Sequence, residues 1–146
     1  MTKMKSEKLK KIKMPVLVVS AFIKKDNKFL LTFDPKFEFW RVPGGKPKFG
    51  EKIEDALKRE IKEELGVEIS IDKFLGFGQD IVTPWRKVIG SRLILYFECH
   101  IISGEIKKSK EVADFAWLTL KEIKKHKNLE PAMLDFFKRF NFKNKF

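Results

Sequence analysis

The densest group of potentially reactive side chains is a run of acids between Glu51 and Glu68. Seven acidic and four basic residues give this stretch a charge of −3, inside a chain whose formal net charge is +12. On a helix with roughly 100° per residue, Glu60, Glu63 and Glu64 fall within one sector of about 100°. Like charges so close together destabilise an isolated helix, so this sector needs a positive partner.

One of these acids also points toward the expected core. The same helix carries an apolar stripe, which consists of Ile53, Leu57, Ile61 and Leu65. Glu64 points into this stripe, where a carboxylate costs several kcal/mol unless a positive charge meets it. Arg59 lies on another side of the helical wheel, and neither Lys58 nor Lys62 points into the cluster. Hard oxygen ligands on a rigid helix are what Mg²⁺ or Mn²⁺ requires, so the pattern predicts a divalent metal site.

The spacing around the acids resembles the Nudix box. That motif is Gly, five residues, Glu, seven residues, Arg-Glu-aliphatic, one residue, Glu-Glu, one residue and Gly-aliphatic. All nine specified positions match, at Gly45, Glu51, Arg59, Glu60, Ile61, Glu63, Glu64, Gly66 and Val67. Trp40 and Pro43-Gly44 before the box, and a strand ending near Trp117 after it, are also similar to the family. The resemblance therefore spans most of the chain.

The resemblance implies a fold and a reaction. Nudix proteins are α/β/α sandwiches with a central mixed sheet, and they cleave a phosphoanhydride bond in a nucleoside diphosphate-linked substrate with Mg²⁺ or Mn²⁺. The metal ligands it implies all offer oxygen atoms: Glu60, Glu63, Glu64, the Gly44 carbonyl and, through water, Glu51. Arg59 would orient the acids. The base for the attacking water would be a box glutamate, such as Glu63 or Glu64, or Glu111 on a later loop.

The substrate-binding side follows less directly from the motif. Many relatives carry an Arg just after the second strand, whereas this chain has Thr32-Phe33-Asp34. Phosphate binding is therefore assigned to Lys46, Arg86 and Arg92, and stacking on a base to Trp85. These residues leave open a nucleoside triphosphate, an oxidised one, or ADP-ribose as the substrate. The alternative is a catalytically silent or RNA-directed, decapping-like relative that binds nucleic acid through its basic surface.

The elements that must position these residues alternate between strands and helices. We expect strands at 16–23, 28–33, 37–42, 67–82, 88–102 and 112–118, with Asp26-Asn27 turning the first hairpin and Pro43-Gly44-Gly45 breaking regular structure. We expect helices at 52–65, ended by Gly66, at 119–125 and at 131–140. The short helix carries a capping box of Thr119 and Glu122. The last helix has a stripe expected in the core: Met133, Leu134, Phe136, Phe137 and Phe140.

The composition favours a folded domain. Of 146 residues 43% are hydrophobic, which is close to the globular norm. The longest apolar stretch, Met14 to Ile23, has ten residues, whereas a membrane-spanning helix needs about 20, so we expect no membrane span. We expect a basic N-terminal extension at 1–14 and a single Nudix hydrolase domain at 15–146.

Charge and cysteine content bear on partners and location. A charge of +12 fits an anionic partner, but 27 of the 32 basic residues are Lys, spread along the chain. We interpret them as a solvated surface, so nucleic acid stays open as a partner but is not favoured. The lone Cys99 is expected to be a buried small hydrophobe, in keeping with a reducing, cytoplasmic location. A homodimer also stays open, since relatives are often dimers.

Overall fold

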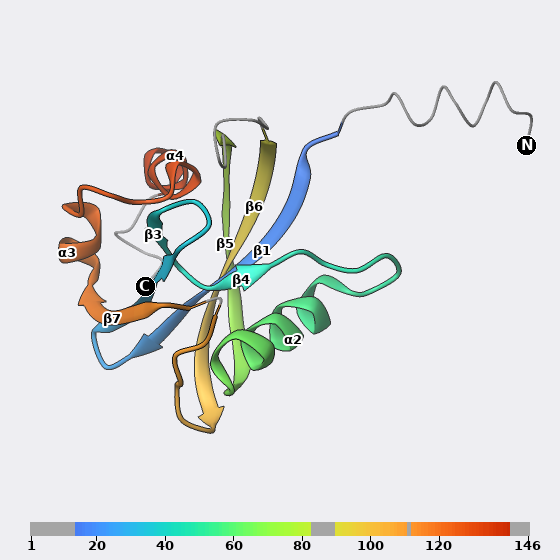
Figure 1. Ribbon diagram of the computed structural model, residues 1–146, viewed down its shortest axis with the longest axis vertical. Helices are drawn as coiled ribbons and strands as arrows, with labels where there is room; N and C mark the ends of the chain where they lie inside the picture. The colour runs from blue at the N-terminus through green and yellow to red at the C-terminus, as the bar shows by residue number, and fades with distance from the viewer. Residues whose placement is uncertain (1–13, 83–89, 111, 141–146) are drawn as a thin grey trace, which may run out of the picture.

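The computed structural model describes residues 14–82, 90–110 and 112–140. Its centre is a seven-stranded mixed sheet with the strand order β3-β2-β1-β6-β5, in which β4 also pairs with β1 and β7 with β2. The strands are β1 (Val16–Lys25), β2 (Lys28–Asp34), β3 (Phe39–Arg41), β4 (Gly44–Gly45), β5 (Glu68–Val82), β6 (Gly90–Ser103) and β7 (Asp114–Thr119). The helices are α2 (Ile53–Leu65), α3 (Leu120–Lys124) and α4 (Pro131–Arg139). Helix α2 packs on one side of the sheet and α3 and α4 on the other (Figure 1), as an α/β/α sandwich requires.

Strand β1 is the centre of this sandwich because both of its faces are buried. Val18 and Phe22 belong to the core beneath α4, whereas Val19 and Ala21 belong to the core beneath α2. The hairpin from β1 to β2 turns at Asp26, whose φ of 57° is the left-handed conformation that Asp tolerates. The predicted hairpin is confirmed, and β1 also pairs in parallel with β6, which makes the sheet mixed.

Helix α2 forms where its pattern predicted. Ala56, Leu57 and Ile61 are fully buried against β1, and the helix ends at Gly66. Gly66 has a φ of 75° and donates its N–H to the Lys62 carbonyl at 2.9 Å, the left-handed helix end that glycine favours. Because the apolar stripe faces β1, the neighbouring acidic sector lies at the edge of this packing surface.

The segment before α2 differs from the expectation. Pro43-Gly44-Gly45 was expected to break regular structure, but Gly44 and Gly45 form β4 and pair with Ser20 and Val19 of β1. A Cβ atom at Gly44 would lie 2.0 Å from the Val19 carbonyl oxygen, so only glycine allows the two strands to approach this closely. The pairing fixes the start of the box loop against the centre of the sheet.

The remaining elements largely follow their patterns. The capping box at α3 is present, and Cys99 is fully buried. In the last helix Met133 is buried as expected, but Leu134 is wrong as a core residue because its side chain is 45% exposed. The third strand is also shorter than expected, at Phe39–Arg41. No helix in the described ranges is long and apolar enough to cross a membrane.

Candidate active site

A single guanidinium group holds three of the box acids. Arg59 donates from Nε and Nη2 to the two carboxylate oxygens of Glu51, at 2.7 and 2.9 Å. Its Nη1 also donates to Glu60 at 2.9 Å and to Glu63 at 3.2 Å. The expectation that Arg59 lies away from the cluster is therefore wrong, since its long side chain reaches across the helical wheel. The three carboxylates converge on this one cation.

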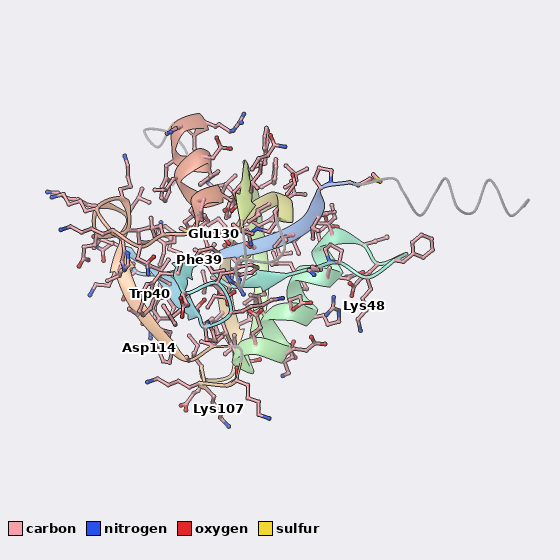
Figure 2. All side chains as sticks on the ribbon, turned by 45° about the horizontal axis from the view of Figure 1, so that its top comes forward. Phe39, Trp40, Lys48, Lys107, Asp114 and Glu130 are labelled. Carbon is pink, nitrogen blue, oxygen red and sulfur yellow. The ribbon has the colours of Figure 1, made fainter. Side chains whose placement is uncertain are left out.

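The acidity of Glu51 is strongly perturbed by its hydrogen bonds. The hydrogen bond from Arg59 is the main cause that lowers the pKa of this carboxyl to about 2, and a second hydrogen bond comes from the Lys48 backbone N–H at 2.9 Å. The acids in turn raise the pKa of Arg59. Lys48 lies on the exposed loop before α2 (Figure 2), so Glu51 ties this loop to the helix.

The fourth box acid, Glu64, has a different partner. Its side chain is only 5% exposed, and its Oε1 lies 3.6 Å from Nη2 of Arg41 on β3. Arg41 in turn donates from Nε to Asp34 at 3.0 Å. Burial alone would lower the pKa of Arg41, but the nearby carboxylates, with Glu64 first among them, outweigh burial and raise it. The positive charge that Glu64 needs therefore comes from another element.

Sequence reasoning did not single out Arg41. The available signal was its position just before Val42-Pro43-Gly44, the segment that must run past the box helix. Its Nη1 also donates to the carbonyls of Val42 and Gly44, at 3.2 and 3.4 Å. Arg41 therefore contacts both Glu64 and Gly44, two of the oxygen donors that the motif implies.

Gly45 sets the distance between the loop and the acidic helix. A Cβ atom there would lie 2.3 Å from both Cδ and Oε2 of Glu60. The backbone thus leaves a cradle that the Glu60 carboxylate fills, and the Gly44 carbonyl lies one residue away. Glycine at this position brings a side-chain oxygen donor and a backbone one to the same part of the site.

These donors have the chemistry that a hard divalent cation needs. Five carboxylates, from the four box glutamates and Asp34, share two guanidinium groups, which leaves an excess of three negative charges. The residues therefore fit Mg²⁺ or Mn²⁺ in kind and in charge. As the side chains stand, however, no three His, Cys, Asp or Glu groups among the described residues surround one point. Glu63, whose side chain is 53% exposed, has room to turn toward its neighbours.

A pocket of about 120 Å³ opens beside this cluster. It brings together Gly44, Gly45 and two of the predicted substrate-binding residues, Lys46 and Arg92, although they come from different parts of the chain. The side chain of Arg92 is mostly buried, and its guanidinium lies 5.2 Å from the ring centre of Phe37. The other predicted residues, Glu111, Trp85 and Arg86, lie outside the described residues.

Arg92 belongs to a buried polar network that the sequence did not reveal. It pairs with Asp80 on β5, and its Nη2 also donates to Glu130 at 3.1 Å. The Tyr96 hydroxyl donates to the other oxygen of Glu130 at 3.0 Å. Burial is the main cause that raises the pKa of Glu130, which lies inside the molecule (Figure 2). Glu130 occupies the N-cap position of α4, but its side chain makes no capping hydrogen bond there.

The chain is similar in sequence and in fold to several known proteins. The NUDIX domain model matches residues 14–140. The nucleoside triphosphatase NudI of Escherichia coli K12 is 34% identical over 112 residues, which cover 69% of this chain and 79% of that protein. The crystal structure of the MutT protein from Methanosarcina mazei Go1 has a TM-score of 0.77 at 24% identity, covering 92% of this chain and 99% of that one. The solution structure of the E. coli ORF135 protein has a TM-score of 0.66 at 27% identity, covering 84% and 86%.

Three findings thus agree. The nine box positions are present in the sequence, the sheet and helices have the arrangement of the solved relatives, and the family model covers all but the ends of the chain. The box acids lie together at the edge of α2 beside a pocket with basic residues. The chain therefore belongs to the Nudix family and is a hydrolase of phosphoanhydride bonds.

Proposed function

We propose that this chain is a metal-dependent pyrophosphohydrolase that converts nucleoside triphosphates to nucleoside monophosphates and pyrophosphate. The observation that carries the proposal is the grouping of four box glutamates and the Gly44 carbonyl beside a pocket lined by Lys46 and Arg92. Triphosphates are favoured over other nucleotides because the related NudI is a nucleoside triphosphatase. An anionic chain of phosphates matches both the basic pocket residues and a cation on the acids.

The roles of the residues follow from their contacts. Glu60, Glu63, Glu64 and the Gly44 carbonyl would hold Mg²⁺ or Mn²⁺, with Glu51 acting through water. The cation would lower the pKa of the attacking water and neutralise charge on the leaving pyrophosphate. Arg59 orients Glu51 and Glu60 through its hydrogen bonds.

We assign proton removal to a box glutamate or to Glu111, and phosphate binding to a basic residue of the pocket. Glu63 is exposed enough to accept the proton of the water, and Glu111 remains the candidate on the later loop. Lys46 lies exposed at the mouth of the pocket, where its ammonium can meet a phosphate oxygen. Arg92 is held by two carboxylates, so we assign it the position of the pocket wall rather than a free phosphate contact.

A substrate screen tests the proposed reaction. The chain would be incubated with nucleoside triphosphates, oxidised triphosphates, ADP-ribose, dinucleoside polyphosphates and capped RNA, with Mg²⁺ or with EDTA, and products identified by mass. We expect triphosphates to give monophosphate and pyrophosphate in the presence of Mg²⁺ but not in the presence of EDTA. Cleavage of ADP-ribose or capped RNA without cleavage of any triphosphate would show that triphosphates are not the substrate. RNA binding without any hydrolysis would favour the alternative of a catalytically silent protein that binds nucleic acid.

Two substitutions test the assignment of the acids. Glu63→Gln and Glu64→Gln each remove one negative charge and keep the shape of the side chain, so both should abolish Mg²⁺-dependent hydrolysis while circular dichroism stays unchanged. Glu54→Gln is the matched control, because Glu54 is an exposed acid in the first turn of the same helix, outside the cluster. Hydrolysis at the normal rate in Glu63→Gln or Glu64→Gln would contradict the assignment.

A further inference from the structure

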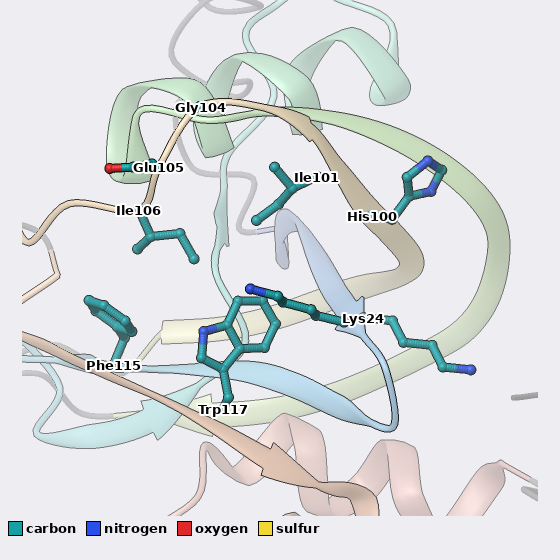
Figure 3. Close-up of a pocket in the computed structure, with 9 residues that line it drawn as sticks. Lys24, His100, Ile101, Gly104, Glu105, Ile106, Phe115 and Trp117 are labelled. Carbon is teal, nitrogen blue, oxygen red and sulfur yellow. The ribbon is translucent and has the colours of Figure 1, made fainter.

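A second pocket lies at the other end of β1, away from the box acids. It encloses about 400 Å³, a size typical of small-molecule sites. Figure 3 shows its floor and walls, which combine aromatic, aliphatic and basic side chains: Trp117, Phe115, Ile101, Ile106, Lys24 and Lys25. The pocket is therefore neither purely apolar nor a simple patch of charge.

Strand β1 separates this pocket from the candidate active site. The box loop pairs with β1 at Ser20, whereas Lys25 lies five residues further along the strand. At about 3.3 Å per residue this places the two sites roughly 17 Å apart along β1. None of the box acids lines the second pocket. A ligand here would not occupy the candidate active site.

The basic side of the pocket carries a positive charge that is not paired with a carboxylate among the described residues. Lys25 forms no ion pair with a carboxylate in the described part of the chain, and its Nζ lies 5.8 Å from the ring centre of Trp117. Lys24 also lines the pocket, but its ammonium points away from Trp117 (Figure 3). His100, at the rim, is already held by Asp72 at 2.9 Å. Glu105 also lines the pocket, but its carboxylate points away from the space between Trp117 and Ile101 (Figure 3). The pocket therefore attracts an anion on its lysine side.

The opposite side offers a flat apolar surface. Trp117 and Phe115 lie two residues apart on β7, so their side chains share one face of that strand, and both are half-buried against the core beneath α2. Among the described residues no hydrogen bond uses the indole N–H of Trp117. Trp117 thus provides both a ring for stacking and a donor that is free to bind a ligand.

We propose that this pocket binds an aromatic phosphate such as a nucleoside monophosphate, with its ring on Trp117 and its phosphate at Lys25. An aliphatic anion would leave the indole surface uncovered, and a neutral ring would leave Lys25 without an anionic partner. This site is separate from the proposed reaction and needs no metal.

Adenosine monophosphate in EDTA is the probe, since the reaction proposed for the box requires a divalent cation. The full chain labelled with ¹⁵N is titrated, and the indole N–H resonance of Trp117 is identified by its loss in Trp117→Phe. We expect saturable shifts of this resonance, in the normal chain and equally in Glu64→Gln. Adenosine and inorganic phosphate should each bind at least about tenfold more weakly, because each makes only half of the contacts.

A charge reversal and its matched control complete the test. Lys25→Glu should weaken binding of adenosine monophosphate at least about tenfold. Lys138→Glu should leave it unchanged, since Lys138 is an exposed residue of α4, on the other side of the sheet, and does not line the pocket. The proposal is overturned if the Trp117 resonance does not respond, if inorganic phosphate binds as tightly as the monophosphate, or if both reversals weaken binding equally. Thermal unfolding of each variant confirms that it is folded.

Discussion

Replacing Gly45 with alanine changes the site by a single methyl group whose effect can be worked out from the structure. The new Cβ would lie 2.3 Å from the carboxylate of Glu60, whereas ordinary contact begins at 3.4 Å. The carboxylate must therefore move by about 1.1 Å, the difference between these distances. A misplacement of this size costs on the order of 100-fold in rate at an active site. We expect that loss in kcat/KM for Mg²⁺-dependent hydrolysis, and weaker binding of Mn²⁺ measured by electron paramagnetic resonance.

Substitutions of two other glycines are controls that distinguish a local effect on the site from a general loss of stability. In Gly44→Ala the Cβ would lie 2.0 Å from the Val19 carbonyl oxygen of β1, so a strand must move and the melting temperature should fall sharply. In Gly50→Ala the Cβ meets nothing within 4 Å, although the φ of 81° strains alanine by about 1 kcal/mol. We expect Gly50→Ala to keep its activity.

Gly45→Ala should resemble neither control. The atoms that it meets belong to the flexible end of the Glu60 side chain, so the fold should accommodate the methyl group and melt close to the normal temperature. The reasoning is refuted if Gly45→Ala hydrolyses its substrate at the normal rate, or if it loses as much thermal stability as Gly44→Ala.

Three further predictions concern the charges around α2. Arg41→Met leaves Asp34 and Glu64 without their shared guanidinium, and breaking such a buried pair should cost about 3–5 kcal/mol in urea unfolding; an unchanged free energy of unfolding would contradict this role. Arg59→Met should lower the melting temperature in EDTA, and Mg²⁺ should restore part of the loss by neutralising the same acids; equal losses with and without Mg²⁺ would count against a cation site. Because the pKa of Glu51 is lowered to about 2, its stabilising contribution is complete above the normal carboxyl pKa and is lost as the pH falls toward 2. Glu51→Gln should therefore flatten the acid limb of a stability profile, and an identical profile in the variant would refute the contribution.

Features that depend on neighbouring residues could be predicted from the sequence. The turn at Asp26, the capping box at Thr119 and the helix end at Gly66 each depend on residues within one turn of chain, and all three are confirmed. The burial of Glu64 also followed from the helical period. The spacing of the box could be recognised because every position lies on one loop and one helix.

Features that depend on distant parts of the chain could not be predicted in this way. Arg41 on β3 reaches Glu64 on α2 because β4 pairs the start of the box loop with β1. Glu130 accepts hydrogen bonds from Arg92 and Tyr96, residues 38 and 34 positions away in the sequence. The position of Arg59 relative to the acids was predicted wrongly for another reason. A helical wheel records the direction of Cβ and ignores the reach of a long side chain.

The Arg59 cluster has a consequence for the protein without bound metal. Arg59 already pairs with Glu51, Glu60 and Glu63 and offsets part of their charge, so we expect the acidic helix to form without a cation. Structural zinc domains show the opposite behaviour, because they unfold when the metal leaves. Here we expect a chelator to stop the proposed hydrolysis while the protein stays folded. Adding the divalent cation back should restore the activity.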